Sequence, residues 1–320
     1  MNSASQTEHF VTLFDSHYLP LGLCLYRSLE EHAQPFHLWI VAMDDACAEA
    51  LAKVNLPAAT VVRLPQLENE ALRAVKGQRS VGEYCWTLTP FLPSYVFRQL
   101  PELERVTYLD ADLFFFQSPH VLLDEFLRTG KHVLITEHAF APEHAGYARY
   151  GRFCVQFVTF RNSDPANRVL RWWQERCIEW CYAREEDGKF GDQKYLDEWP
   201  QRFSEEVHIL SQTERTVAPW NVAYLGRSER PVHPVFYHFH SLKIVSSRRV
   251  VLHFMYYIGR KNRWIYDRYV QTLRAVVRQM RSLGIPVIGR PLFGEKVGRA
   301  HAGYVFGKTY LSGKTDWATL

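Results

Sequence analysis

The sequence predicts an α/β protein built on a mostly parallel sheet with helices on both faces. Short apolar runs typical of buried strands alternate with longer segments whose apolar residues recur at helical spacing. The chain has 320 residues, of which 47% are hydrophobic, and this is enough for a sizeable core. No internal repeat or low-complexity segment interrupts the alternation. In sheets of this kind, ligands bind outside the carboxyl ends of the strands.

The first half of the alternation is regular. "FVTLF" (10–14) predicts a buried strand, and "YLPLGLCLYRSLEEH" (18–32) has the apolar spacing of a helix. "FHLWIVAM" (36–43) predicts a second strand. The acidic start of "DDACAEALAKV" (44–54) suits a helix N-terminus, where the helix dipole favours negative charge. "TVVRL" (60–64) predicts a third strand.

The alternation continues through the middle of the chain. "RVTYL" (105–109) predicts a strand, and "HVLLDEFLRTG" (120–130) predicts a short helix closed by its terminal glycine. "KHVLITE" (131–137) and "FCVQFVTF" (153–160) predict two further strands. "PANRVLRWWQERCIEWCYARE" (165–185) has the apolar spacing of a long helix.

The regularity weakens from about residue 200. "PVFYHFHSLKIV" (234–245) is typical of a strand, with histidines at alternate positions, and "YDRYVQTLRAVVRQMRSLG" (266–284) predicts a basic amphipathic helix. No flexible linker precedes this region. We therefore expect a first domain over residues 1–245 and a basic, aromatic C-terminal extension over 246–320 that packs on it.

Composition narrows the classes of function. The six cysteines are spread thinly and form no C-x-x-C pair, which argues against a disulfide framework and a zinc cluster. A net charge of +4 is too mild to indicate nucleic acid by itself. The start of the chain has no basic segment followed by an apolar one, and no stretch reaches ~18 consecutive apolar residues. We expect a cytoplasmic protein.

Two acids stand one residue apart directly after the strand at 105–109. In extended backbone, Asp110 and Asp112 point to the same side while Ala111 faces away. Two carboxylates held that close repel each other, and a divalent cation relieves the repulsion. Oxygen ligands suit Mg²⁺ or Mn²⁺, which also bridge phosphate oxygens. The alternative is a pair of solvated turn acids or helix caps.

Four stretches in order resemble one enzyme family. "YLDAD" (108–112), "TLFDSHYLPLGLCLYRSL" (12–29), "GDQKYL" (191–196) and "YHFHSLK" (237–243) resemble motifs of the GT-A nucleotide-sugar glycosyltransferases, and more closely of the retaining family 8. The resemblance covers residues 10 to about 245. It implies the GT-A fold and transfer of a sugar, with retention, from a nucleotide-diphosphate donor. We expect a UDP-linked donor and a glycan or lipid-linked acceptor.

The resemblance implies a metal site. Asp110 and Asp112 would hold Mn²⁺ or Mg²⁺ on the donor diphosphate, and Asp110 and Ala111 would contact the donor itself. His238 would be the third protein ligand, since neutral imidazole suits Mn²⁺. His240 shares a strand face with His238 in the predicted strand, so it is the alternative ligand. Both histidines also suit ordinary hydrogen-bonded positions in an aromatic strand.

The resemblance also assigns the nucleotide contacts. Asp15 would accept a hydrogen bond from the base, with Phe14 and Tyr18 beside it for stacking, and Lys243 would reach the diphosphate as a mobile point charge. The alternative for these residues is a loop acid between two core aromatics, which suits Phe14 better than Tyr18.

Gln193 and Asp192 are the candidate catalytic residues. The resemblance places Gln193 near the anomeric carbon on the face opposite the leaving group, and Asp192 at sugar or acceptor hydroxyls. No strong nucleophilic carboxylate stands out, so front-face displacement fits better than a two-carboxylate scheme. The alternative is that "GDQ" only begins a helix, with Asp192 as its cap.

The chain also departs from the family pattern. Trp86 stands near the place of a usual arginine, which leaves Arg79 or Lys243 to neutralise the diphosphate. The segment that usually carries an asparagine before a glycine reads "FCVQF", with Cys154 and Gln156. These departures indicate a divergent branch.

Two other classes of function compete with sugar transfer. Phosphatases resembling the haloacid dehalogenases also place D-x-D after a strand, but they favour Thr or Val where this chain has Phe114, and a position nearer the N-terminus. A non-catalytic protein that binds sugar nucleotides or glycans is favoured by Cys154 and Trp86.

The segment 246–269 interleaves basic and aromatic residues. This composition is typical of a peripheral contact with a membrane interface or an anionic glycolipid at the inner face of the membrane, such as a precursor of a cell-envelope polysaccharide. The alternative is a solvated basic face over packed aromatics. Nucleic acid fits less well than either, because no recognised module accompanies the charge.

Overall fold

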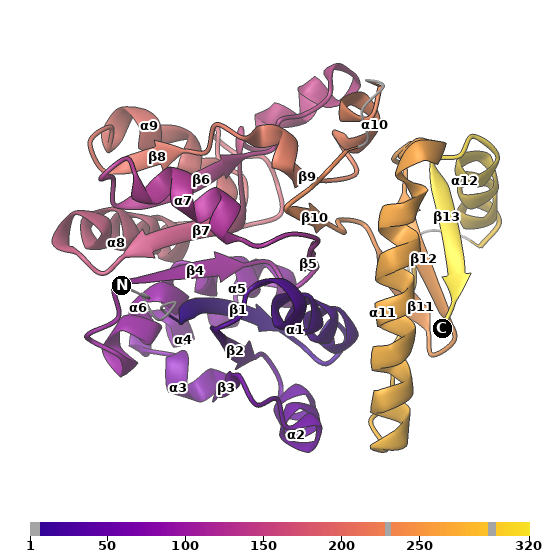
Figure 1. The fold of residues 1–320 in the computed structure, drawn as a ribbon, viewed down its shortest axis with the longest axis horizontal. Coiled ribbons are helices and arrows are strands. Elements are labelled where there is room, and N and C mark those ends of the chain that lie inside the picture. Colours follow the sequence, from indigo (N-terminus) through magenta and orange to yellow (C-terminus); the bar gives the residue numbers. More distant parts are fainter. Residues whose placement is uncertain (1–6, 228–231, 294–298) are drawn as a thin grey trace, which may run out of the picture.

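A seven-stranded sheet forms the centre of the molecule (Figure 1), in the order β3-β2-β1-β4-β7-β6-β8. A computed structural model describes residues 7–227, 232–293 and 299–320. All strands run in one direction except β7, which is antiparallel to both its neighbours. The strands are β1 (Glu8–Phe14), β2 (Phe36–Ala42), β3 (Ala59–Arg63), β4 (Arg105–Leu109), β6 (Val133–Glu137), β7 (Phe153–Arg161) and β8 (Val207–Ile209). The predicted mostly parallel sheet is confirmed.

Side-chain alternation along the strands divides the core into two layers. Phe10 and Phe14 of β1 belong to one hydrophobic cluster, whereas Val11 and Leu13 belong to the other. Helices cover both faces, so both sides of each strand are apolar and the strands read as continuous hydrophobic runs. The helices of this part are α1 (Leu19–His32), α2 (Asp45–Val54), α3 (Leu64–Leu67), α4 (Glu70–Lys76), α5 (Val81–Leu88), α6 (Phe91–Gln99), α7 (His120–Leu127), α8 (Asp164–Glu179), α9 (Trp199–Arg202) and α10 (Val222–Leu225).

Short 3₁₀-helices complete the connections. They are η1 (Pro142–Tyr150), η2 (Gln193–Glu198), η3 (Thr213–Arg215) and η4 (Arg260–Asn262). The helix start expected at residue 44 is confirmed, because the side chain of Asp44 accepts a hydrogen bond from the backbone N–H of Cys47 at 2.6 Å. The long helix expected to reach residue 185 ends earlier, at Glu179, where Trp180 adopts an extended conformation.

The strand expected over 234–245 is broken in two, and that prediction was wrong. β10 (Phe236–His238) pairs with β5 (Leu113–Phe115) and β9 (Thr216–Val217), whereas β11 (Lys243–Ser246) belongs to another sheet. Between them the chain turns, with Ser241 in the left-handed region at φ 68°. His240 lies in this turn, so the two histidines do not share a strand face.

The C-terminal residues form a unit to one side of the central sheet (Figure 1). β11, β12 (Arg249–Phe254) and β13 (Thr315–Thr319) make an antiparallel sheet, accompanied by α11 (Arg263–Ser282) and α12 (Arg299–Leu311). α11 packs against α1. None of the helices in the described part of the chain combines the length and apolar character needed to cross a membrane.

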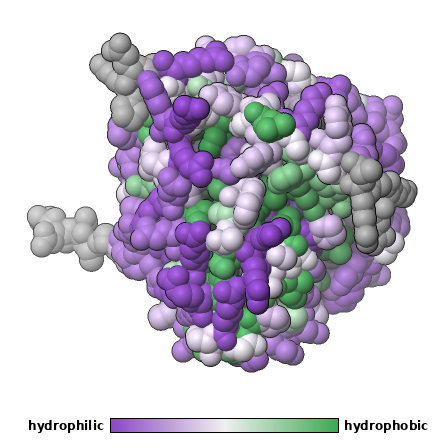
Figure 2. All heavy atoms as spheres, turned by 90° about the vertical axis from the view of Figure 1, so that its right-hand side faces the viewer, coloured by the Kyte–Doolittle hydropathy of each residue, from purple (hydrophilic) through white to green (hydrophobic). Residues whose placement is uncertain are grey.

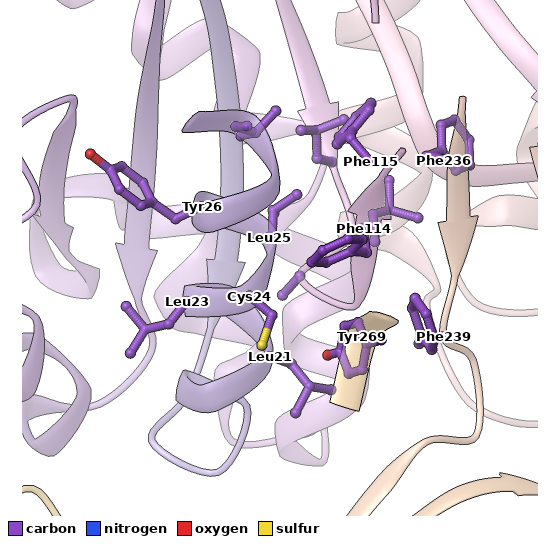
Figure 3. Packing of buried hydrophobic residues seen from close by; sticks show 14 of the residues in the cluster. Leu21, Leu23, Cys24, Leu25, Tyr26, Phe114, Phe115, Phe236, Phe239 and Tyr269 are labelled. Atoms are coloured by element: carbon purple, nitrogen blue, oxygen red, sulfur yellow. The ribbon is translucent and has the colours of Figure 1, made fainter. Parts of the chain in front are cut away.

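α11 shares a hydrophobic core with the first part of the chain (Figure 3). The ring of Tyr269 stacks on Phe239 with centroids 3.8 Å apart and meets Phe114 of β5 at 5.5 Å. Cys24 of α1 belongs to the same cluster. The extension is therefore anchored directly behind β5 and β10. The division into residues 1–245 and 246–320 stays a prediction.

Candidate active site

A cavity of about 720 Å³ opens at the carboxyl ends of β1 and β4. Its walls come from distant parts of the chain, including the β1–α1 loop, the β4–β5 turn, η1, the start of η2, the β10–β11 turn and the segment after α11. The residues that the sequence assigned to the site line this cavity, except Lys243 and Arg79. The residues brought together are Phe14, Asp15, Tyr18, Asp110, Ala111, Asp112, Asp192, Gln193, His238 and His240.

Asp110 and Asp112 converge through a turn and not through extended backbone. β4 ends at Leu109 and β5 begins at Leu113, and the backbone N–H of Leu113 donates to the carbonyl of Asp110 at 3.2 Å. The two carboxylates and His238 each offer an atom within 4.8 Å of one another. The Nε2 of His238 lies 3.1 Å from Oδ1 of Asp112 and 3.8 Å from Oδ2 of Asp110. Two carboxylate oxygens and one imidazole nitrogen form a donor set that fits Mn²⁺ or Mg²⁺.

A hydrogen bond on the ring nitrogen that faces away from the carboxylates holds His238 in position. Its Nδ1 lies 2.7 Å from Oε1 of Gln156 on β7, and both side chains are buried. Because an amide oxygen only accepts, Nδ1 carries a proton, and Nε2 is the ring nitrogen that faces the carboxylates. Metal-binding histidines commonly have such a partner on the second ring nitrogen. Gln156 stands at one of the positions where the chain departs from the family pattern, and its part in orienting His238 was not expected from the sequence.

The three groups perturb one another. Burial raises the pKa of Asp110 to about 6, with repulsion from Asp112 adding to the rise and His238 opposing it. Burial would also raise the pKa of Asp112, but the neighbouring His238 lowers it below the usual range. Burial would lower the pKa of His238, yet the charge and hydrogen bond of Asp112 raise it well above 6.5. Without a metal, His238 is therefore the counter-charge of Asp112.

His240 stands apart from this group. Burial and the charge of His238 lower its pKa to about 4, so it is neutral at physiological pH. Its ring lies 5.7 Å from that of His238, and it is not among the three residues whose donor atoms converge. The geometry favours His238 over His240 as the metal ligand.

Asp15 forms the second polar cluster of the cavity. Its Oδ1 accepts hydrogen bonds from the backbone N–H groups of His17 and Tyr18, both at 3.0 Å. Oδ2 is paired with the guanidinium of Arg290, whose carbon lies 5.7 Å from the centre of the Tyr18 ring. Tyr18 is 39% exposed and available for stacking, whereas Phe14 is buried in the core at 2% exposure. The alternative of a core aromatic therefore suits Phe14.

Arg290 is the cation that sequence reasoning missed. Lys243 lies on β11 outside the cavity lining, where burial and the charge of Arg290 lower its pKa. Arg79 is also outside the lining, with its guanidinium 3.9 Å from the ring centre of Tyr182 and a hydrogen bond to the carbonyl of Ile178. Arg290 comes from the segment after α11, 275 residues from Asp15, and no local pattern marks it.

Asp192 and Gln193 enter the cavity at the start of η2. Asp192 occupies the N-cap position of η2, but its side chain makes no capping hydrogen bond. A capping role therefore does not explain why an aspartate stands at this position. Burial, followed by the charge of Asp110, raises the pKa of Asp192 to about 8. The Nε2 of Gln193 donates to the carbonyl of Tyr150 at 3.0 Å. Gly151, at φ 140°, lies against Gln193, where an added Cβ would come within 3.3 Å of its Cγ.

Comparison with known proteins gives relatives and a fold. No protein-family model matches the chain. The uncharacterized protein YfnF of Bacillus subtilis (strain 168) is 30% identical over 297 residues, covering 87% of this chain and 95% of YfnF. The uncharacterized protein YfnD of the same organism is 29% identical over 288 residues, covering 86% of this chain and 92% of YfnD.

Solved structures extend the comparison. The galactosyltransferase LgtC, in complex with donor and acceptor sugar analogs, superposes with a TM-score of 0.55 at 15% identity, covering 86% of this chain and 99% of LgtC. The bifunctional glycosyltransferase WbbM gives a TM-score of 0.50 at 14% identity, covering 90% of this chain and 53% of WbbM. At this identity the likeness establishes the shared fold, and the chemistry has to be argued from the site.

Proposed function

The chain belongs to the same family as YfnF of Bacillus subtilis and has the GT-A fold, and from this premise we propose that it is a metal-dependent glycosyltransferase. The donor we propose is a nucleotide-diphosphate sugar of the UDP type, and the acceptor is a glycan or a lipid-linked sugar. The observation that carries the proposal is the convergence of Asp110, Asp112 and His238 in one cavity with Asp15 and Gln193.

Asp110, Asp112 and His238 would hold the Mn²⁺ or Mg²⁺ ion. When bound, the ion would supply Lewis-acid stabilisation of the departing nucleotide diphosphate. The protein contributes the positions of the three ligands, with His238 buried and the two carboxylates half-buried. His238 has to be neutral to bind a metal, so its proton leaves when the ion arrives.

The cluster around Asp15 would bind the nucleotide. A carboxylate accepts a hydrogen bond from a pyrimidine N–H, and the exposed ring of Tyr18 offers a face for stacking. Arg290 would neutralise phosphate charge in place of the arginine that Trp86 replaces, because a guanidinium matches phosphate geometry. Lys243 stays a second proposed diphosphate contact, which requires a movement of its side chain toward the cavity.

Gln193 and Asp192 would act at the donor sugar and the acceptor. In the described part of the chain, Oε1 of Gln193 has no hydrogen-bond partner, so it can face a developing positive charge at the anomeric carbon. Asp192, with a pKa of about 8, is protonated at neutral pH and is a poor nucleophile. This supports front-face displacement with retention over a two-carboxylate mechanism. Asp192 can then contact a sugar hydroxyl.

We also propose a peripheral membrane contact through residues 246–269. Met255 and Tyr257 are 55% and 52% exposed, and Arg260 and Trp264 of the same segment are also exposed. Figure 2 shows the face of the C-terminal unit, on which hydrophobic side chains lie between hydrophilic ones. Sedimentation with phosphatidylglycerol vesicles, compared with phosphatidylcholine vesicles, tests this contact. Equal or absent binding to both would contradict it.

The test of the function is turnover of a panel of nucleotide sugars, measured as release of the nucleotide diphosphate with Mn²⁺ or with a chelator. We expect metal-dependent release with one UDP-sugar, and NMR of the early product should show a retained anomeric configuration. Asp112→Asn should remove the metal dependence of nucleotide binding. Gln193→Ala should lower kcat and leave nucleotide affinity nearly unchanged, because the side chain acts at the sugar.

The competing function is a non-catalytic protein that binds sugar nucleotides. The observations that favour it are Trp86 in the place of an arginine and Cys154, which interacts with His238. Metal-dependent nucleotide binding without turnover of any donor would support it. The phosphatase hypothesis is dropped, because the chain has the GT-A fold.

A further inference from the structure

Six of the aromatic side chains that line the cavity form a group of their own. We call them the aromatic wall, and its members are Trp86, Phe140, Tyr147, Tyr150, Phe190 and Tyr256. Neighbouring rings are in contact. Trp86 meets Phe190 at 6.2 Å between ring centroids, Phe190 meets Tyr150 at 4.7 Å, and Tyr150 meets Tyr147 at 6.4 Å.

The wall continues to His240, whose ring lies 5.7 Å from that of the proposed metal ligand His238. His144 stacks on Tyr147 at 5.7 Å and meets Tyr256 at 5.3 Å, and Tyr256 meets His240 at 6.0 Å. The wall also touches the proposed catalytic residue Gln193, whose Nε2 donates to the carbonyl of Tyr150. A molecule lying along the wall would therefore have one end at the reaction centre.

The acidic and basic side chains that line the cavity are separate from the aromatic wall. Among the described residues they are Asp15, Asp110, Asp112, Asp192, Arg290 and the histidines His138, His238 and His240. A diphosphate needs the metal and a cation, so it belongs beside these groups and leaves the wall for a different molecule.

The rings are positioned for contact with a ligand and are not part of the tightly buried core. Tyr147 is 41% exposed, and Trp86, Phe140, Tyr150 and Phe190 are half-buried. Arg149 stacks on Tyr150 and is paired with Glu185, which balances its charge. Sites for small molecules are typically lined by such apolar rings with a few polar groups at their edges.

We propose that the aromatic wall is the acceptor subsite and that it takes an uncharged saccharide of two or more units. The inference rests on the proposed function. The C–H bonds on one face of a sugar ring carry partial positive charge and meet the negative face of an aromatic ring. The row of contacting rings from Trp86 to Tyr147 extends beyond a single sugar ring, and the absence of charged groups in the wall disfavours an anionic sugar.

The test is saturation-transfer NMR on the protein loaded with UDP and Mn²⁺. The probes are glucose, maltose, lactose, cellobiose and maltotriose, with glucuronic acid and 3′-sialyllactose as anionic probes. We expect signals from at least one neutral di- or trisaccharide and weaker ones from glucose and from the anionic probes. Tyr147→Ala and Phe190→Ala should weaken that saccharide about 10-fold each, which is the size of a lost stacking contact.

Tyr310→Ala is the matched control, because Tyr310 is 48% exposed on α12 and does not line the cavity. Its saccharide signals should equal those of the wild type. UDP affinity should be unchanged in all three variants. Absence of signal from every neutral probe, equal binding of the anionic probes, or unchanged binding in both wall variants would overturn the inference. Saccharide binding at the wall without donor turnover would uphold the subsite and overturn the transferase function, so the two failures are distinguishable.

Discussion

Replacing Gln156 by leucine should weaken metal binding without removing any metal ligand. Oε1 of Gln156 accepts from Nδ1 of His238 at 2.7 Å, and the two residues are 1% and 5% exposed, so water cannot replace the lost acceptor. Leucine leaves Nδ1–H unpaired and the imidazole free to turn its Nε2 away from the carboxylates. Loss of such an orienting partner typically costs 10–100-fold in metal affinity, or about 1.4–2.8 kcal/mol.

Stability should change little by comparison. Nε2 of Gln156 is buried and has no hydrogen-bond partner in the described part of the chain, so leucine removes one unsatisfied group while creating another at His238. Gln156→Glu is the conservative control. A carboxylate also accepts from Nδ1–H, and carboxylate–histidine–metal arrangements are common, so its Mn²⁺ affinity should stay close to that of the wild type.

The assay is calorimetric titration of Mn²⁺ into UDP-saturated protein at several pH values, with UDP alone as the reference. Because Asp112 holds the pKa of His238 well above 6.5, binding should release a proton at neutral pH, and affinity should fall as the pH is lowered. The fall in affinity should therefore begin at a higher pH than the ~6.5 of an unperturbed histidine. An unchanged Mn²⁺ affinity in Gln156→Leu would refute the orienting role.

Three further predictions follow from other contacts. Arg290→Ala should weaken UDP binding about 10-fold, measured by calorimetry, because it removes a charged partner worth ~1.5–3 kcal/mol. Unchanged or tighter binding would show that Arg290 pairs with Asp15 without contacting the nucleotide. Burial would raise the pKa of Glu125, but hydrogen bonds from β8 and the loop after it lower this pKa to about 2. Glu125→Gln should therefore lower the free energy of unfolding by ~2 kcal/mol at pH 7, measured in urea, and this deficit should shrink as the pH falls from 4.5 toward 2. An equal deficit at pH 3 would contradict the prediction. Gly22→Ala should cost ~1–3 kcal/mol in thermal unfolding, because its Cβ would lie 2.3 Å from the Phe14 ring; a gain in stability would mean that the ring moves freely.

The strands and the polar residues at their ends were predictable because the information is local. β1 and β2 are apolar on both faces and bounded by polar residues, and a parallel sheet brings their carboxyl ends to one edge. Asp15 and Asp110 follow such strands directly, so their meeting in one cavity needed only the fold class and the short motifs.

Contacts made by the tertiary fold were not predictable from local patterns. Arg290 reaches Asp15 only because the segment after α11 returns to β11, where the backbone N–H of Arg290 donates to the carbonyl of Ile244. Gln156 meets His238 because β7 lies beside the β4–β5 turn. Neither position carries a motif, and a single sequence does not show which distant side chains share a cavity.

Burial and close contact change the charges of the acid pair and of the histidine beside it. In the sequence, Asp110 and Asp112 have no neighbouring counter-charge, and we expected a metal ion to neutralise them. In the fold, His238 already supplies a positive charge 3.1 Å from Asp112, while Asp110, with a pKa of about 6, is partly protonated near neutral pH. A metal ion therefore has to displace protons to enter. The phosphate oxygens of a nucleotide diphosphate offer it further ligands at that moment, and for this reason we expect metal and nucleotide to bind cooperatively.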